Sequence, residues 1–252
     1  MRKNSSRSQE VNLLVYISGI SILREFVSEM EFVIMNLNAS KMDMGRLTIL
    51  PIFSLLLVAN ITGVFMDAKA LEPVSTIKVA RLIHHLLLAC FNALLVFLYL
   101  IRSAARSTTK SLFAKTIAVI ATFLPFTIPM LSRPSDNPNI LLLASLVTIF
   151  GIAIAICSLS TLGGSFSIIP QARRLVQTGP YKLVRHPVYL GELISILGIV
   201  LARPSAIAMA IYVLLIALLF YRALQEEKLL AGIFPEYETY SLRRARFIPG
   251  IF

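Results

Sequence analysis

Long stretches of this 252-residue chain lack charged residues. Five apolar segments contain no Asp, Glu, Lys or Arg: residues 47–66, 82–101, 116–131, 137–172 and 204–221. A transmembrane helix needs about 20 mainly apolar residues, and these segments reach or approach that length. Strands of a membrane β-barrel alternate apolar and polar residues, so continuously apolar segments exclude a barrel. We therefore expect an all-α, polytopic integral membrane protein with about six transmembrane helices.

Acidic residues are scarce beside basic ones. The chain has 24 Lys and Arg against 13 Asp and Glu, a net charge of +11. The basic residues concentrate in alternate loops, around residues 102–115, 173–185 and 222–246. Membrane proteins show this pattern when those loops face the cytosol. We therefore expect membrane lipids and no nucleic acid as partners. Both termini are predicted to be cytosolic, in a bacterial inner membrane or the endoplasmic reticulum.

Only two cysteines and three histidines are present. Cys90 and Cys157 lie in apolar segments, where packed thiols are typical. His84 and His85 are adjacent, so on a helix they point about 100° apart and cannot readily share one ion. No Cys or His spacing typical of a metal site occurs. We expect no metal site and interpret both histidines as structural.

Three regions differ in composition. Residues 1–46 begin polar and contain an apolar stretch, residues 11–23, that is too short to span a membrane. No small-residue cleavage site is evident, so an interfacial amphipathic helix is favoured over a signal peptide. Residues 47–138 are predicted to form the N-terminal transmembrane helices. Residues 139–252 are predicted to form a further span, a connector, a helical hairpin and a cytosolic tail.

Proline and glycine mark the expected breaks. Pro125 and Pro129 should kink the third span, which membrane helices tolerate when neighbours satisfy the freed carbonyls. Residues 162–187 contain too many Gly and Pro residues to form one helix, so they are interpreted as a connector. The following hairpin should turn just before Pro204, and its first arm, residues 189–202, is short for a full span.

The connector and the helices after it carry an ordered series of polar and aromatic residues. The series reads Gly179-x-Tyr181-x3-Arg185-His186-Pro187-x-Tyr189-x-Gly191, then Arg222-x3-Glu226-Glu227, then Phe234, Tyr237, Tyr240 and Arg246-x2-Pro249. Upstream, residues 162–167 read Leu-Gly-Gly-Ser-Phe-Ser. Over about residues 139–252, this series resembles the isoprenylcysteine carboxyl methyltransferase family and the related phospholipid N-methyltransferases. One departure is Phe234-Pro235, where that family usually has Phe-Gly.

The resemblance implies S-adenosyl-L-methionine as the cofactor, bound at a cytosolic site in the C-terminal part of the chain. By position it assigns these residues to the cofactor: Gln171, Arg174, Leu175, Val176, Tyr181, His186, Pro187, Tyr189 and Glu226. It implies that Arg222 and Glu226 are catalytic and that Arg222 meets the carboxylate of the acceptor. Arg246 fits a late arginine of the family and is predicted to bind the acceptor as well.

The chemistry of these residue types agrees with that assignment. Acidic groups suit the amino group or ribose of S-adenosylmethionine, and aromatic faces suit its adenine or sulfonium. Arg and His side chains suit its carboxylate. Arg222 and Glu226 are four residues apart and should share one face of a helix. A carboxylate acceptor is already anionic and needs no general base. Arg222 therefore favours a lipophilic or lipidated acceptor with a carboxylate, such as a prenylcysteine-like group.

Other hypotheses stay open at this point. A phospholipid N-methyltransferase would use Arg222 to hold a lipid phosphate. Membrane reductases of the sterol-reductase type have a similar Arg-His-Pro-x-Tyr-x-Gly region and bind NADPH. A non-catalytic membrane module with a decayed site is a third alternative. Glu226-Glu227 after Arg222, together with residues 162–167, favours the methyltransferase. Arg185 is interpreted as an anchor or structural clamp, and the oligomeric state is not indicated.

Overall fold

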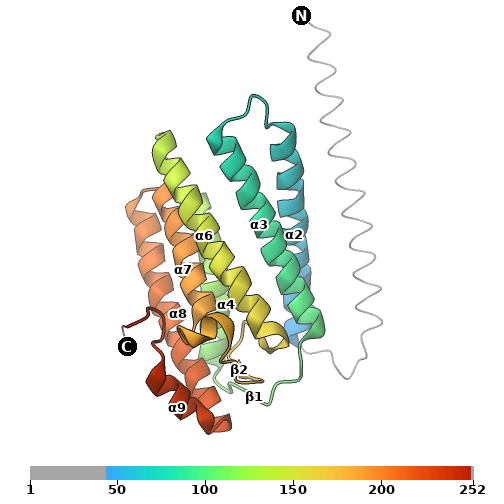
Figure 1. Cartoon of the computed structure of the whole chain (residues 1–252), viewed down its shortest axis with the longest axis vertical. Helices are drawn as coiled ribbons and strands as arrows, with labels where there is room; N and C mark the ends of the chain where they lie inside the picture. Colours follow the sequence, from blue (N-terminus) through green and yellow to red (C-terminus); the bar gives the residue numbers. More distant parts are fainter. Residues whose placement is uncertain (1–43, 251–252) are drawn as a thin grey trace, which may run out of the picture.

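The computed structural model describes residues 44–250 and is built almost entirely of helices (Figure 1). The α-helices are α2 (Met44–Lys69), α3 (Thr76–Ile101), α4 (Leu112–Phe123), α5 (Thr127–Leu131), α6 (Pro138–Leu162), α7 (Pro187–Ala202), α8 (Ala206–Ile233) and α9 (Glu236–Arg243). The shorter elements are η2 (Leu124–Phe126), η3 (Gly163–Ser165) and η4 (Gly179–Lys182), with strands β1 (Ser107–Thr108) and β2 (Gln171–Ala172). The interfacial helix predicted near the N-terminus lies outside the described residues.

Within residues 44–250, five helical segments are long and apolar enough to cross a membrane. They are Ile49–Lys69, Thr76–Ile101, Leu112–Leu131, Pro138–Ser165 and Ala206–Ile233. Helix α7 is also apolar but has 16 residues. At about 1.5 Å per residue it is shorter than a hydrocarbon core of about 30 Å. The predicted all-α, polytopic membrane fold is confirmed, and α7 is the short arm of the predicted hairpin.

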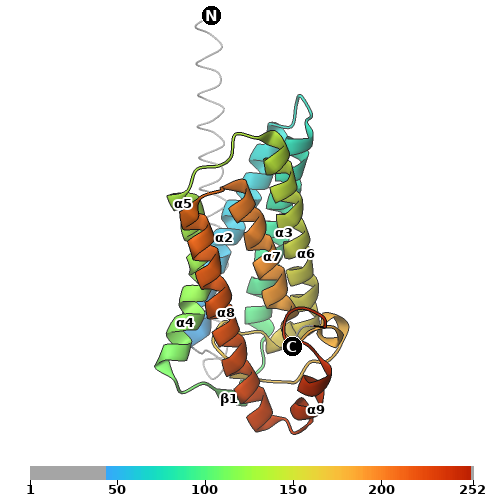
Figure 2. The same ribbon diagram turned by 90° about the vertical axis from the view of Figure 1, so that its left-hand side faces the viewer.

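The long helices run side by side, and their connections gather at two ends (Figures 1 and 2). One end holds the links from α2 to α3, from α5 to α6 and from α7 to α8. The opposite end holds the α3–α4 link, the long α6–α7 connector, α9 and the C-terminal tail. The loops that the charge pattern grouped on one side therefore do lie at one end of the molecule.

Polar residues set the starts of four helices. Each N-cap side chain accepts a hydrogen bond from a backbone N–H of the first turn, which otherwise has no helical partner. The caps are Ser75, Ser111, Asn137 and Ser205. The third span is interrupted at η2, which contains Pro125, as the sequence predicted.

Helices α6 and α7 approach each other closely because glycines face the contact. A Cβ atom added to Gly151 would lie 2.3 Å from the backbone nitrogen of Ser195, and one added to Gly198 would lie 2.2 Å from Oγ1 of Thr148. A Cβ added to Gly191 would similarly meet the α6 backbone at 2.7 Å. Small residues allow such backbone contact between membrane helices. This contact holds the start of α7, and with it the site described below, against α6.

A small antiparallel ribbon joins the α3–α4 link to the connector. Ser107 pairs with Ala172, and Thr108 pairs with Gln171. The backbone N–H of Arg106 also donates to the carbonyl of Ala172 at 2.8 Å. The ribbon was not predicted, because pairs of two residues are too short to show a period in the sequence. It ties the N-terminal helices to the connector.

Candidate functional site

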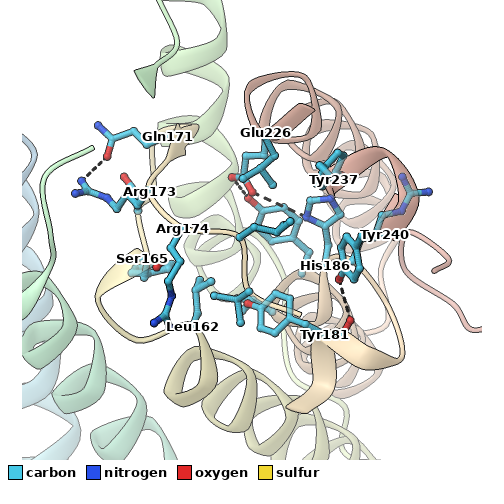
Figure 3. A pocket seen from close by; sticks show the side chains of 18 of the residues that line it. Leu162, Ser165, Gln171, Arg173, Arg174, Tyr181, His186, Glu226, Tyr237 and Tyr240 are labelled. Atoms are coloured by element: carbon cyan, nitrogen blue, oxygen red, sulfur yellow. Dashed lines mark hydrogen bonds and ion pairs between the residues drawn. The ribbon is translucent and has the colours of Figure 1, made fainter. Parts of the chain in front are cut away.

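A cleft lies where the connector, the start of α7, the end of α8 and helix α9 meet (Figure 3). The empty space within it, including its open mouth, is about 790 Å³. The connector contributes Ser165, Phe166, Ser167, Gln171, Arg173, Arg174, Leu175, Val176, Tyr181, Arg185 and His186. The helices contribute Leu162, Val188, Tyr189, Arg222, Glu226, Leu230, Tyr237 and Tyr240.

The connector wall is held in place by its neighbours. The backbone N–H of Ile168 donates to the hydroxyl of Tyr99 on α3 at 3.2 Å, and Ile168 is buried. Further along, Nη2 of Arg173 donates to Oε1 of Gln171 at 2.6 Å, as Figure 3 shows. The amide oxygen of Gln171 is therefore bound within the connector itself.

Arg222 is deeply buried, with 4% of its surface exposed, and makes three contacts around the cleft. Its Nη2 donates to the carbonyl of Ser167 at 3.2 Å, and its Nε lies 3.4 Å from Oε1 of Glu226. Its guanidinium also lies 4.9 Å from the centre of the Tyr189 ring. The Tyr189 hydroxyl in turn donates to the same Glu226 oxygen. Arg222 and Glu226 thus share one face of α8, as their spacing indicated.

His186 immediately precedes α7, and Pro187 is the first residue of that helix, where the missing N–H of proline costs nothing. The imidazole stacks on the Tyr189 ring, with centroids 5.3 Å apart and an interplanar angle of 2°. Its Nε2 lies 3.0 Å from Oε1 of Glu227, and its Nδ1 lies 3.9 Å from Oε2 of Glu226. His186 is thus placed between two carboxylates of α8.

Glu227 is a buried carboxylate that binds three side chains. Nη1 of Arg185 lies 3.1 Å from its Oε2. Nε and Nη2 of Arg246 donate to Oε1 and Oε2 at 2.8 and 2.9 Å, a bidentate pair. His186 is the third partner. Arg185 therefore pairs with Glu227 and also lines the cleft, and its interpretation as an anchor or structural clamp stays a prediction. Arg246, predicted to bind the acceptor, is paired with Glu227 and is not among the residues that line the cleft. Its role in binding the acceptor stays a prediction.

Three tyrosines, Tyr181 from η4 and Tyr237 and Tyr240 from α9, line the cleft together. The hydroxyl of Tyr240 donates to the carbonyl of Tyr181 at 2.8 Å, and the rings of Tyr237 and Tyr240 lie 6.0 Å apart in an edge contact. Burial raises the pKa of Tyr240 to about 12, and burial also raises the pKa of Tyr181. These phenols are therefore neutral at physiological pH and present hydrogen-bond donors and ring faces.

The structure gathers nearly all of the predicted cofactor residues at this cleft. Those in its wall are Gln171, Arg174, Leu175, Val176, Tyr181, His186, Tyr189 and Glu226. Pro187 lies instead in the buried first turn of α7. The sequence had not assigned the carbonyl of Ser167, the side chain of Arg173 or the carboxylate of Glu227. The Leu-Gly-Gly-Ser-Phe-Ser stretch and the second glutamate were noticed, but no contact could be assigned to them.

Comparison with known families identifies part of this region. Residues 142–232 match the isoprenylcysteine carboxyl methyltransferase (ICMT) family, which confirms the resemblance seen in the sequence. The matched segment includes α7, the connector and nearly all of α8, and therefore most of the cleft wall. Helix α9 and the tail lie beyond it.

Two curated relatives share a shorter segment. The chain is 37% identical over 78 residues to the cobalt-zinc-cadmium resistance protein CzcN of Cupriavidus metallidurans, covering 31% of this chain and 36% of that protein. It is 34% identical over 82 residues to the nickel-cobalt-cadmium resistance protein NccN of Alcaligenes xylosoxydans xylosoxydans, covering 32% and 38%. The chain thus spans little more than a third of these relatives. Among residues 44–250, no group of three His, Cys, Asp or Glu side chains is placed to hold a metal ion.

Proposed function

We propose that this protein is an integral membrane methyltransferase that uses S-adenosyl-L-methionine to methylate the carboxylate of a lipophilic acceptor. The observation that carries the proposal is the cleft, which joins Arg222, Glu226 and the stacked His186–Tyr189 pair. These four side chains lie within the segment that matches the methyltransferase family. They also lie where the apolar helix α7 follows the polar connector, a place that suits a soluble cofactor and a lipophilic acceptor.

The residues of the cleft fit the parts of S-adenosylmethionine. The Glu226 carboxylate suits the amino group or the ribose hydroxyls, and the guanidinium of Arg174 suits the cofactor carboxylate. The faces of Tyr181 and Tyr237 suit adenine or the sulfonium. When bound, the cofactor supplies a methyl group activated by the positive sulfur. The protein has to hold it and exclude water.

Arg222 is the residue that we propose for the acceptor. Its charge is fixed at the inner side of the cleft by the Ser167 carbonyl and by Glu226. A buried cation favours an anionic partner, and a guanidinium can bind a carboxylate through two parallel hydrogen bonds. The acceptor carboxylate carries no proton at neutral pH, so the site needs alignment of the reacting atoms and removal of water rather than a general base.

We further propose that the cleft faces the cytosol. The basic residues of the α3–α4 link, the connector and the tail all lie at the cleft end of the bundle. Reporter fusions after Arg102 and after Arg222 should report the cytosol, and a fusion at Asp136, in the α5–α6 link, should report the opposite side. A reversed pattern would refute this orientation.

Ligand binding and product chemistry test the proposed reaction. S-adenosylhomocysteine should raise the melting temperature of the detergent-solubilised protein, and NADPH should not. Stabilisation by NADPH alone would favour the reductase, and stabilisation by neither would favour a non-catalytic module. Membrane extracts incubated with the protein and methyl-labelled S-adenosylmethionine should then release volatile methanol on base hydrolysis, because a methyl ester is cleaved. Labelled products that resist base would point to an amine acceptor instead.

A further inference from the structure

Glu227 has no assigned role in the proposed reaction, yet three side chains contact this carboxylate beside the cleft. It lies on α8, one residue after Glu226, and 9% of its surface is exposed. Two arginines and one imidazole contact its two oxygens. A buried carboxylate that has two guanidinium partners is stabilised in its charged form.

The partners of Glu227 come from two segments that run beside each other. Residues 245–247, here named the C-terminal strap, lie along the end of the connector. Val184 and Ala245 form a parallel bridge, and the backbone N–H of Arg185 donates to the carbonyl of Ala245 at 2.9 Å. The N–H of His186 donates to the carbonyl of Arg246 at 3.0 Å. The strap lies beyond the segment that matches the family, and it is hydrogen-bonded to the backbone of His186.

The geometry decides which imidazole nitrogen carries a permanent proton. An ionised carboxylate only accepts hydrogen bonds, so Glu227 requires a hydrogen on Nε2 of His186, which lies 3.0 Å away. That requirement holds for the neutral ring and for the imidazolium alike. In the neutral ring, Nδ1 is then the nitrogen that has no hydrogen and can accept a hydrogen bond. This atom is on the side of Glu226, at 3.9 Å, in the wall of the cleft.

The groups packed around the His186 ring fit this assignment of its two nitrogens. Helix α8 contributes Glu226 and Glu227, and α7 contributes Tyr189, stacked on the ring face. From the strap, the Phe247 ring lies 5.8 Å away, while the charge of Arg246 is directed to Glu227. Of the other nearby guanidinium groups, Arg185 is bound to Glu227 and Arg222 is paired with Glu226. The cations around His186 are therefore paired with these two carboxylates, and Nδ1 is left to face the cleft.

We infer that Glu227 is a positioning residue, which fixes the tautomer of His186 so that Nδ1 alone exchanges hydrogen bonds and protons with a ligand in the cleft. Arg246 supports this role by holding the strap and the carboxylate together. A neutral Nδ1 accepts a hydrogen bond from an amino or hydroxyl group, and a protonated Nδ1 donates one to a carboxylate. The identity of that ligand as S-adenosylmethionine rests on the proposed function, whereas the tautomer does not.

Histidine-selective ¹⁵N NMR tests the tautomer directly. The chain has only three histidines, so the His186 ring can be assigned by comparison with His186→Gln. In the ligand-free wild type, the neutral ring should carry its hydrogen on Nε2 and leave Nδ1 without one. In Glu227→Gln, both neutral tautomers should be populated. The matched control is Glu238→Gln, which alters an exposed carboxylate on α9 and should leave the His186 spectrum unchanged.

Cofactor affinity gives the functional counterpart. Glu227→Gln should weaken S-adenosylhomocysteine binding about tenfold, the effect of weakening one hydrogen bond to a charged group, and should alter its pH profile. Glu227→Asp keeps the carboxylate and should restore part of the affinity. A wild-type ring protonated on Nδ1 when neutral would overturn the inference, as would a folded Glu227→Gln protein with an unchanged tautomer. Failure of the wild type to bind S-adenosylhomocysteine would refute the proposed function and leave the NMR test of Glu227 intact.

Discussion

The two ends of the helix bundle are built in different ways. At the end away from the cleft, the links are short and several polar contacts are local, such as the Nζ of Lys78 with the carbonyl of Glu72 at 3.2 Å. An ion pair between Asp67 and His85, at 2.6 Å, joins α2 to α3 near that end. At the cleft end, buried charged groups bind partners far away in the chain, as Glu227 binds Arg185.

The difference indicates where function lies. Burying charges costs free energy, and even a well-paired buried ion pair is often no more stabilising than apolar packing. Apolar packing alone therefore does not account for the buried charged groups at the cleft end, among them Arg222 and Glu227, and their position agrees with the ligand site proposed above. The following predictions separate the two ends, beginning with the largest expected effect.

Replacing Arg222 should have the largest effect. Arg222→Ala should lower methyl transfer by about 100-fold or more, because a misaligned acceptor reacts slowly. It should leave S-adenosylhomocysteine affinity nearly unchanged, and Arg222→Lys should recover part of the rate, since a point charge cannot reproduce bidentate geometry. Calorimetric binding and turnover on the same preparations provide the measurement. Loss of cofactor affinity as severe as that of Glu226→Gln would instead make Arg222 a structural partner of Glu226.

Replacing the proposed cofactor residues should mainly affect affinity. His186→Ala, Tyr189→Ala and Glu226→Gln should each weaken S-adenosylhomocysteine binding by roughly 1.5–3 kcal/mol, the range for a hydrogen bond to a charged group. Calorimetry on variants with unchanged helical circular dichroism would measure this. Unaltered S-adenosylhomocysteine affinity in all three variants would refute the assignment of these residues to the cofactor site.

A change in helix packing should reduce stability rather than chemistry. Gly198→Ala would place a Cβ atom 2.2 Å from Oγ1 of Thr148, so the α6–α7 contact should lose about 1–3 kcal/mol, as is typical of overpacking. Gly232→Ala is the matched control, since nothing lies within 4 Å of its added Cβ. That control should unfold at the same or a higher temperature, because Ala favours helix. Equal melting temperatures for the two variants would contradict the close packing described here.

The smallest effect is expected at the opposite end. Asp67→Asn removes the charge that pairs with His85, a contact in which both side chains keep some exposure. The protein should lose less than about 1 kcal/mol of stability, as for most partly exposed ion pairs. Its turnover and cofactor affinity should equal those of the wild type. A marked loss of activity would show that the two ends are functionally coupled.

Much of the fold was predictable from local patterns. Apolar segments located each of the long helices, and Pro125 located the break in the third span. The charge pattern grouped the loops that the structure places at one end. Helix ends were less accurate: α8 runs to Ile233, well past the last apolar residue of its segment, because the polar turns that follow keep packing against the connector and α9.

The site was predictable as a set of residues but not as a network. Resemblance to a family indicated which connector and hairpin residues would meet, and most of them line one cleft. It did not indicate that Glu227, rather than Glu226, would bind Arg246, because neighbouring residues on a helix point in different directions. Nor did it indicate the ribbon that joins the α3–α4 link to the connector.

The sequence by itself determined that the chain is a membrane protein, because the lack of charge over helix-length segments leaves no other environment for them. It also determined which helices are short or broken, since proline and glycine act on the backbone where they occur. Only the tertiary structure decided which charged groups pair. Around Glu227, those contacts join residues that are up to 42 positions apart in the chain. Which residues meet there depends on the close packing of α6 against α7 and on the position of the C-terminal strap.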